Sequence, residues 1–201
     1  MSITLRTGTP ADAAAIHGLI SANLADGHLL PRSLEDVADH AARFLVADLE
    51  DEVIGCAELA PLSDAVAEVR SLVVSESHRG RRTGASLLTA LADRARGLGF
   101  ATLCAFTHQP SHFVRMGFSL VPHVWMPEKI AHDCVTCSQF RQCGQYAVAL
   151  ALRPGAAPRG ADRSNPARGV AQPRASVERL RLTLTPVPAD MSDREAEKVP
   201  A

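Results

Sequence analysis

A strand that breaks into an Arg/Gly-rich turn and then into a helix constrains this chain most. Residues 73–91 read VVSESHRGRRTGASLLTAL, with a β-branched run before the turn. After the turn, Leu87, Leu88 and Leu91 recur at the spacing of one helix face. A helix N-terminus offers unpaired N–H groups and a partial positive charge, which suit a phosphate group. The stretch therefore predicts a phosphate-binding turn.

Arg82 leaves this prediction open, because it stands where a third glycine would allow the closest approach of the backbone to a phosphate. Its Cβ would crowd the phosphate or open the turn, or its charge would help to hold the phosphate. The alternative is a solvated basic turn that caps an ordinary helix, because a single glycine-rich motif is a weak signal.

The start of each of the two N-terminal helices carries a capping pattern. Thr9 and Asp12 form a capping box around Pro10, and Ser33 and Asp36 form another. For the second helix we expect four inward-facing residues: Leu34, Val37, Ala38 and Ala41.

The remaining pattern alternates strands and helices in the order β-α-α-β-β-β-α-β-α-β, followed by a closing strand. This order predicts an α/β (α+β) fold, a mixed sheet with helices packed on its faces. The strands are expected at residues 3–9, 43–49, 52–62, 65–74, 100–107, 118–124 and 145–152.

Composition indicates one domain and excludes several classes of protein. The 201 residues are 46% hydrophobic, enough for one good core. A net charge of −1 argues against nucleic-acid binding by bulk charge, and no apolar run approaches the roughly 18–20 residues of a membrane span. Five cysteines without a secretory signal indicate free thiols in a reducing cytosol. We therefore expect a cytoplasmic protein without nucleic-acid or membrane partners.

A sharp change in composition near Arg153 predicts a domain boundary. The following stretch is rich in Pro, Ala, Gly and Arg and has almost no large apolar residue. Such a segment cannot bury enough surface to offset its ordering entropy. We expect a globular domain over 1–152 and a disordered tail over 153–201.

Over roughly residues 3–150 the chain resembles the GNAT superfamily of acyl-CoA-dependent N-acetyltransferases. The matching pieces are the strand EVRSLVV, the turn HRGRRTGASLL with its helix, and FVRMGF before the sixth strand. GHLLPRSLEDV, AEVRSLVV and MPEKIAHDCVTCSQFRQCGQYAVAL together resemble one branch, the short bacterial amino-acid N-acetyltransferases of the N-acetylglutamate synthase type.

The resemblance implies a mostly antiparallel central sheet and acetyl-CoA as co-substrate. The turn amides would hold the CoA pyrophosphate, and the amides of Leu72, Val73 and Val74 would meet the pantetheine and the thioester carbonyl. The residues expected at the turn are Arg79, Gly80, Arg81, Arg82, Thr83, Gly84 and Ala85.

Direct acetyl transfer needs a deprotonated amine, a donor for the thioester oxygen and a proton for the leaving thiolate. The catalytic candidates are Glu68, as proton acceptor, and the Leu72 amide, as donor. Glu68 is equally readable as a structural ion-pair partner of Arg70, two residues along the same strand face. Many GNAT enzymes have a tyrosine acid where this chain has Phe113, which leaves water or His112 as the proton source.

An acceptor with two carboxylates, such as glutamate, needs two or three cations in its pocket. Arg32, Arg70 and Lys129 are the candidates from segments that match the branch. Taken singly, each is better interpreted as an exposed charge or a surface ion pair, and only their positions in three branch-specific segments favour the pocket.

The stretch Cys134-x2-Cys137-x5-Cys143, near His132, has the density of a metal site but lacks a complete second ligand pair. We expect no metal, and buried thiols packing the end of the domain. Cys56 and Cys104, within predicted strands, are expected in the core.

The sequence thus predicts an acetyl-CoA-dependent acetyltransferase for the α-amino group of an amino acid, with L-glutamate first and arginine biosynthesis as the implied role. The alternatives are a GNAT enzyme for another amine and a non-catalytic acyl-CoA sensor. The expected partner is a small amino-acid substrate, and a homodimer stays open.

Overall fold

The computed structural model describes residues 3–24, 29–138 and 140–154. The expected tail, with its short apolar stretch at 177–187, lies outside the described residues apart from 153 and 154. The domain boundary at 152 and the disorder of the tail therefore stay predictions.

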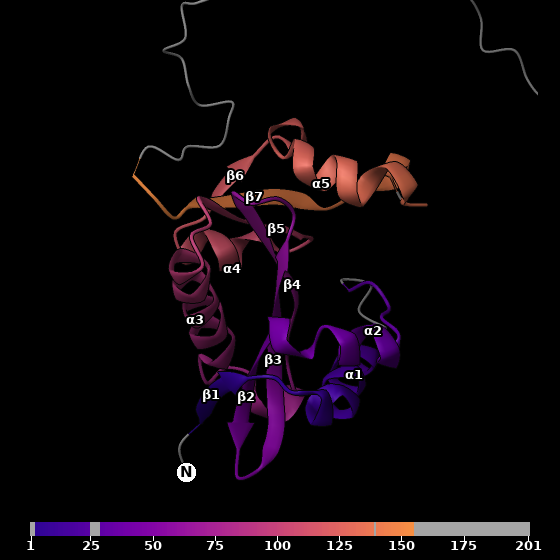
Figure 1. Ribbon diagram of the computed structural model, residues 1–201, viewed down its shortest axis with the longest axis vertical. Helices are drawn as coiled ribbons and strands as arrows, with labels where there is room; N and C mark the ends of the chain where they lie inside the picture. Colours follow the sequence, from indigo (N-terminus) through magenta and orange to yellow (C-terminus); the bar gives the residue numbers. More distant parts are fainter. Residues whose placement is uncertain (1–2, 25–28, 139, 155–201) are drawn as a thin grey trace, which may run out of the picture. The chain divides into compact units, whose positions relative to one another are not determined.

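The described part of the chain forms a seven-stranded sheet in the order β1-β2-β3-β4-β5-β7-β6 (Figure 1). Only the β4–β5 pair is parallel, and the other neighbours are antiparallel. The mixed, mostly antiparallel sheet is confirmed. Its strands are β1 Thr4–Thr7, β2 Phe44–Leu49, β3 Glu52–Pro61, β4 Val66–Val74, β5 Thr102–Thr107, β6 Ser119–Val121 and β7 Tyr146–Ala151.

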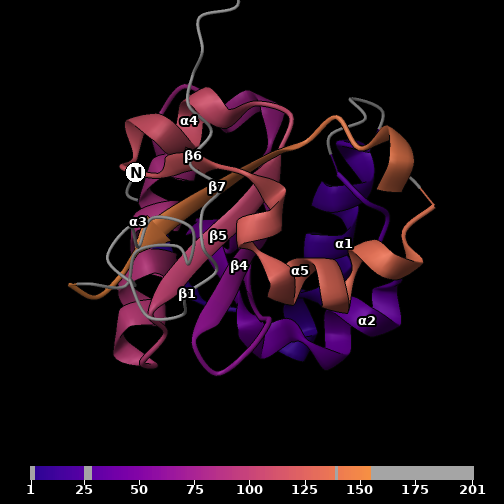
Figure 2. The same ribbon diagram turned by 90° about the horizontal axis from the view of Figure 1, so that it is seen from above.

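Helices cover both faces of the sheet. Figures 1 and 2 show α3 and α4 on one face, and α1, α2 and α5 on the other. α5 was not in the predicted order, since its six residues lie in a segment that we expected to be irregular. The helices are α1 Ala13–Ala22, α2 Leu34–Asp39, α3 Thr83–Gly97, α4 Pro110–Arg115 and α5 Pro127–His132.

Each face has its own core. The larger cluster packs α3 and Phe113 of α4 against the sheet, with Leu87, Leu88 and Leu91 fully buried as the helix spacing predicted. On the opposite face one cluster holds α1 and α2, and another lies beneath the segment that leads into α5. Burial of these apolar faces is the main stabilising contribution to the fold.

The helix starts follow the predicted caps with one difference. The first helix opens with a 3-10 turn, Pro10–Asp12, before α1 begins. Asp12 accepts hydrogen bonds from the Thr9 N–H and hydroxyl, each at 2.7 Å. In α2 the Ser33 hydroxyl accepts from the Asp36 N–H at 3.0 Å.

The inward face predicted for α2 is wrong at one position. Leu34 is 49% exposed, whereas Val37 and Ala41 are buried. The first turn of this short helix extends past the edge of the core, so Leu34 stays exposed although it has the helical spacing of the buried residues.

A bulge and a divergence in the middle of the sheet create the position for a ligand. Against β3, the two residues Ser71 and Leu72 of β4 face the single residue Ala57, and Ser71 has a positive φ of 49°. Parallel pairing between β4 and β5 covers only Val66–Glu68, so beyond Glu68 the strands separate. The gap opens toward the start of α3.

Candidate active site

The turn between β4 and α3 is built from left-handed backbone. Gly80 has φ 78°, and Arg82, the residue before the first residue of α3, has φ 64°. Glycine adopts this conformation freely, whereas Arg82 adopts it at a cost of about 1–2 kcal/mol. The turn aims the free N–H groups of a 15-residue helix outward, as a phosphate site requires.

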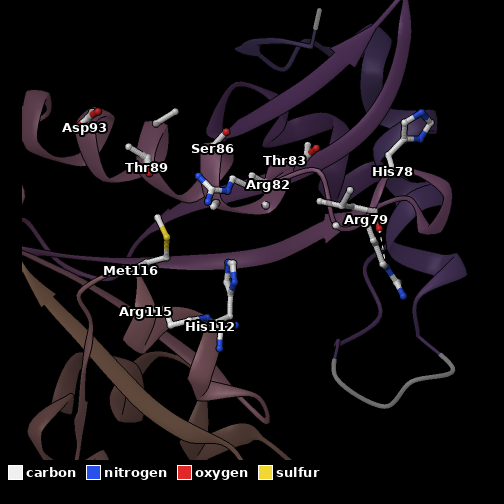
Figure 3. Close-up of a pocket in the computed structure, with 15 residues that line it drawn as sticks. His78, Arg79, Arg82, Thr83, Ser86, Thr89, Asp93, His112, Arg115 and Met116 are labelled. Carbon is white, nitrogen blue, oxygen red and sulfur yellow. Dashed lines mark hydrogen bonds between the residues drawn. The ribbon is translucent and has the colours of Figure 1, made fainter.

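These N–H groups border a cavity of about 970 Å³ between α3 and α4 (Figure 3). The volume suits a cofactor-sized ligand. Seven of the residues expected to bind CoA line it: Val74, Arg79, Gly80, Arg82, Thr83, Gly84 and Ala85. His112, Arg115 and Met116 of α4 form the opposite wall, which the sequence did not assign to the cofactor.

Thr83, the first residue of α3, lines this cavity, but its hydroxyl is shielded from solvent. Its residue is 4% exposed, and its hydroxyl has no hydrogen-bond partner within the described ranges. Leaving a buried hydroxyl unsatisfied costs about 1–3 kcal/mol. The N–H groups of the turn, with Arg82 and Arg115 at the cavity, fit the pyrophosphate of CoA. The Thr83 hydroxyl would join them only after its side chain turns toward the cavity.

Three of the ten residues expected at the cofactor do not line the cavity: Leu72, Val73 and Arg81. The Arg79 guanidinium lines the cavity edge but bonds the Val74 carbonyl at 3.3 Å and the Asn23 side chain, which ties the turn to the end of α1 (Figure 3). The exposed Arg81 and the buried Val73 do not line the cavity. Any contact from Val73 would come from its backbone.

The bulge in β4 changes which residues face each side of the sheet. Before it, Glu68 and Arg70 lie on the face of α5, and Val69 lies on the face of α3. After it, Leu72 packs toward α3 and Val73 toward α1. A residue added by a bulge is left out of the strand ladder, so Ser71 and Leu72 are not both paired with β3.

On the α5 face, the structure joins two of the three expected acceptor cations in one cluster. The Arg70 Nε bonds Glu68 Oε2 at 2.6 Å, and the Lys129 Nζ lies 2.7 Å from Glu68 Oε1. Asp133, just after α5, accepts from both cations, at 2.8 Å from Lys129. We call Glu68, Arg70, Lys129 and Asp133 the Arg70–Lys129 cluster.

The third cation, Arg32, lies at the entry to α2 and reaches the same part of the sheet. Its Nη1 bonds Glu58 Oε2 at 2.7 Å, and its Nε bonds Asp36. Glu58 is 1% exposed and lies directly opposite Arg70 in the register of β3 and β4. The three expected cations therefore gather on one face, beside the point where β4 and β5 separate.

Neighbouring cations hold the Asp133 and Asp36 side chains in the charged form. Burial favours the neutral acid of Asp133, but hydrogen bonds from Lys129 and His132 outweigh it and lower its pKa. The pKa of Asp36 is lowered in the same way, against burial, by Arg32. Both groups are anionic near neutral pH, so each neutralises part of the cationic charge around it.

Of the two residues considered for the thiolate acid, Phe113 replaces the family's tyrosine and lies in the core, whereas His112 lines the cavity. Phe113 is 7% exposed and packs edge-on against Phe118, with ring centroids 5.3 Å apart, as expected for core residues. His112 lies in the cavity wall near Gly84. Burial and the Arg115 charge lower its pKa, which favours the neutral imidazole.

The cysteines divide as the strands predicted, with one correction. Cys56 and Cys104 are buried, and burial raises the pKa of Cys56 to about 12. Cys134 and Cys137 are half-buried, but Cys143 is exposed, so buried packing is wrong for that thiol. Within the described residues, no three His, Cys, Asp or Glu side chains are grouped as metal ligands would be.

Glu58 and Asp133 were missed by sequence reasoning. Glu58 had a usable signal, because a lone carboxylate in the apolar run VIGCAELAP must find a cation when the strand is buried. Asp133 had none, since its contacts with Arg70 depend on the fold of a segment 63 residues away.

In the described part of the chain no helix is both long and apolar enough to span a membrane.

Three comparisons relate this geometry to known proteins. The model of the acetyltransferase (GNAT) family matches residues 19–118. The uncharacterized N-acetyltransferase CT2212 of Chlorobaculum tepidum is 31% identical over 148 residues, which cover 74% of this chain and 96% of that protein. The amino-acid acetyltransferase of Pseudomonas putida is 33% identical over 112 residues, 55% of this chain but 26% of that protein.

Among solved structures, N-acetylglutamate synthase from Neisseria gonorrhoeae, complexed with coenzyme A and N-acetyl-glutamate, superposes with a TM-score of 0.69. It is 25% identical, and the match covers 76% of this chain and 36% of that one. This chain thus spans about a quarter to a third of these two amino-acid acetyltransferases.

Proposed function

The chain belongs to the GNAT family of acetyl-CoA-dependent N-acetyltransferases, and on that premise we propose that it acetylates the α-amino group of an amino acid, with L-glutamate as acceptor. The observation that carries the acceptor class is the meeting of Arg32, Arg70 and Lys129 beside the gap between β4 and β5. A carboxylate-bearing acceptor is the small molecule that such cations bind best.

The cofactor side of the proposal is supported by the turn, its cavity and the unpartnered Thr83 hydroxyl. The Neisseria relative was solved with coenzyme A, which agrees with a CoA site here. When bound, acetyl-CoA supplies an activated acetyl thioester. The turn amides and Thr83 would hold its pyrophosphate, and Arg82 and Arg115 would add positive charge.

The acceptor side of the proposal comes from two relatives and from the cation positions. One relative is called an amino-acid acetyltransferase, and the other was solved with N-acetyl-glutamate. In this chain the acceptor's carboxylates would lie against Arg32 and the Arg70–Lys129 cluster, on the α5 face. Its amine would then point into the gap toward the thioester.

In the proposed reaction, a backbone amide and solvent would do most of the chemistry at the gap between β4 and β5. The Leu72 amide at the bulge would donate to the thioester oxygen as negative charge develops there. Glu68 accepts bonds from both Arg70 and Lys129, which makes it an anchor for the cations. Solvent near the half-buried Asp133 would take the proton of the ammonium group. The amine would attack the thioester carbon directly and the C–S bond would break, so no covalent enzyme intermediate is needed. The CoA thiolate would leave and take a proton from water or His112.

A free-thiol release assay tests the proposal. The protein is mixed with acetyl-CoA and, separately, glutamate, glutamine, lysine and a polyamine. Turnover with glutamate above the other amines supports it. Turnover only with a polyamine would assign another acceptor class, and tight CoA binding without turnover would favour the acyl-CoA sensor.

Two variants locate the acceptor. Arg32→Gln and Lys129→Gln should each raise the acceptor KM about tenfold or more and leave the acetyl-CoA KM within about twofold. Arg96→Gln, an exposed arginine paired with Asp93 on α3, is the matched control. If the acetyl-CoA KM moves as much as the acceptor KM, the acceptor assignment is wrong.

A further inference from the structure

Asp133 occupies the position in the Arg70–Lys129 cluster that an incoming carboxylate would need. Its Oδ2 atom is bonded by Arg70 Nη2 and lies 2.8 Å from Lys129 Nζ. A carboxylate held by a guanidinium and an ammonium together is the arrangement expected for a bound substrate carboxylate. Here the carboxylate belongs to the chain itself.

The two carboxylates of the cluster differ in how firmly they are held. Glu68 lies within β4 and its side chain is 3% exposed, so removing it from its cations would leave a buried charge. Asp133 follows a six-residue helix, and its side chain is 31% exposed. Asp133 is thus the member that solvent or a ligand can replace.

The charges around Asp133 determine which acceptors require it to move away. Two cations and two carboxylates make the Arg70–Lys129 cluster neutral as it stands. Beside it, Arg32 is paired with both Glu58 and Asp36. A second carboxylate on the acceptor adds an unbalanced negative charge unless Asp133 moves away, whereas an amide adds none.

We propose that Asp133 is a built-in competitor for the acceptor's carboxylate and thereby sets how strongly the site discriminates between a dicarboxylic amino acid and its amide. This inference rests on the proposed amino-acid acceptor. Asp133 directly follows α5, which lies on the same face of the sheet as α1 and α2 (Figure 2). Arg32, the residue before the N-cap of α2, lies on this face too. The competitor and the acceptor therefore share one set of cations.

The test is Asp133→Asn, which keeps the shape of the side chain and removes its charge. The ratio of kcat/KM for glutamate to kcat/KM for glutamine should rise about tenfold, through a lower glutamate KM and with an unchanged acetyl-CoA KM. Asp51→Asn is the matched control, because Asp51 is an exposed carboxylate in the β2–β3 turn, at the end of the sheet opposite α5 (Figure 1). The control should leave the ratio as in the wild type.

A second measurement does not depend on turnover. Glutarate, a dicarboxylate without an amine, is titrated calorimetrically into the CoA-bound protein. The Asp133→Asn protein should bind it about tenfold tighter than the wild type. Asp133→Ser, which removes the same charge with a smaller side chain, should shift both readouts in the same direction.

The outcomes separate this inference from the proposed function. A wild type that acetylates no amino acid, with tighter glutarate binding by Asp133→Asn, rejects the proposed function and keeps the competitor. Turnover with glutamate, but an unchanged or higher glutamate KM and unchanged glutarate binding in both variants, keeps the function and overturns the competitor.

Discussion

At the scale of single residues, Arg82 is where the chain departs most from what a phosphate turn favours. It has a left-handed backbone that glycine would adopt without cost, yet it directly precedes α3. Figure 3 shows its side chain extending along α3 toward Ser86, over the cavity. This placement favours a recruited charge over a steric obstacle.

Arg82→Gly should therefore weaken CoA binding about three- to tenfold, because a cation beside the pyrophosphate is lost. The free protein should be as stable as the wild type or slightly more so, since the left-handed position is relieved. Calorimetric titration of CoA and urea unfolding measure the two effects. Arg81→Gly, at an exposed position outside the cavity, is the control, and tighter CoA binding by Arg82→Gly would show that the side chain crowds the phosphate.

The other question at this scale is whether Glu68 anchors the two cations or acts as the general base. As an anchor it holds two cations in a buried position, so Glu68→Gln should cost about 3 kcal/mol of unfolding free energy and raise the acceptor KM. The pH profile of kcat/KM should keep its acidic limb. A variant of normal stability that loses this limb and falls a hundredfold in kcat would identify Glu68 as the base.

At the scale of elements, the entry into the first helix depends on one buried carboxylate. Asp12 accepts two bonds from Arg6 at 2.8 Å and two from Thr9, and Arg6 also bonds Asp48 of β2. The Arg6 bonds, helped by Thr9 and opposed by burial, hold the pKa of Asp12 far below its usual range. The carboxylate thus joins β1, the 3-10 turn and β2.

Asp12→Asn should lower the unfolding free energy at pH 7 by about 2 kcal/mol, the upper range for a cap. Because the folded-state pKa is depressed, this contribution is present above about pH 4 and is lost as the pH falls toward the folded-state pKa. The difference between wild type and variant should shrink between pH 4 and pH 2. Urea unfolding across this range measures it, and a constant difference would contradict the role of the charge.

At the scale of the whole molecule, the sheet brings two unlike sites to its central gap. The cavity for the cofactor lies between α3 and α4, and the acceptor cations lie on the face of α1, α2 and α5 (Figure 2). β4 carries both, with Val74 in the cavity and Arg70 in the cluster. Under the proposed function, this arrangement would place the thioester and the amine against a common strand.

CoA at a hundred times its Kd should add about 2.7 kcal/mol to the unfolding free energy. Pantetheine lacks the pyrophosphate and offers the turn amides and Thr83 no phosphate to bind, so it should add much less to the unfolding free energy. Thermal melts with each ligand measure the difference. Thr83→Val should reduce the CoA effect without destabilising the free protein, and an equal shift with pantetheine would contradict a phosphate site.

Much of the fold followed from local patterns. The caps at Thr9 and Ser33 and the apolar spacing at Leu87 to Leu91 are properties of short segments, and each was confirmed. The segment at α5 lacked such a pattern, so its helix was missed. The gathering of Arg32, Arg70 and Lys129 was predicted through the resemblance, and their binding of an acceptor stays a prediction.

By itself, the sequence determined which segments become strands and helices and which residues carry charge, because periodicity, capping and turn chemistry act over a few neighbouring residues. Only the tertiary structure decided that Asp133 and Glu68 share Lys129, that Glu58 faces Arg70, and that Thr83 keeps an unpartnered hydroxyl. These contacts depend on how separate segments pack, since Glu68 lies 61 residues from Lys129 and the bulge in β4 reverses the strand's alternation. Burial then sets which charges need partners, and burial exists only once the sheet and its helices have packed.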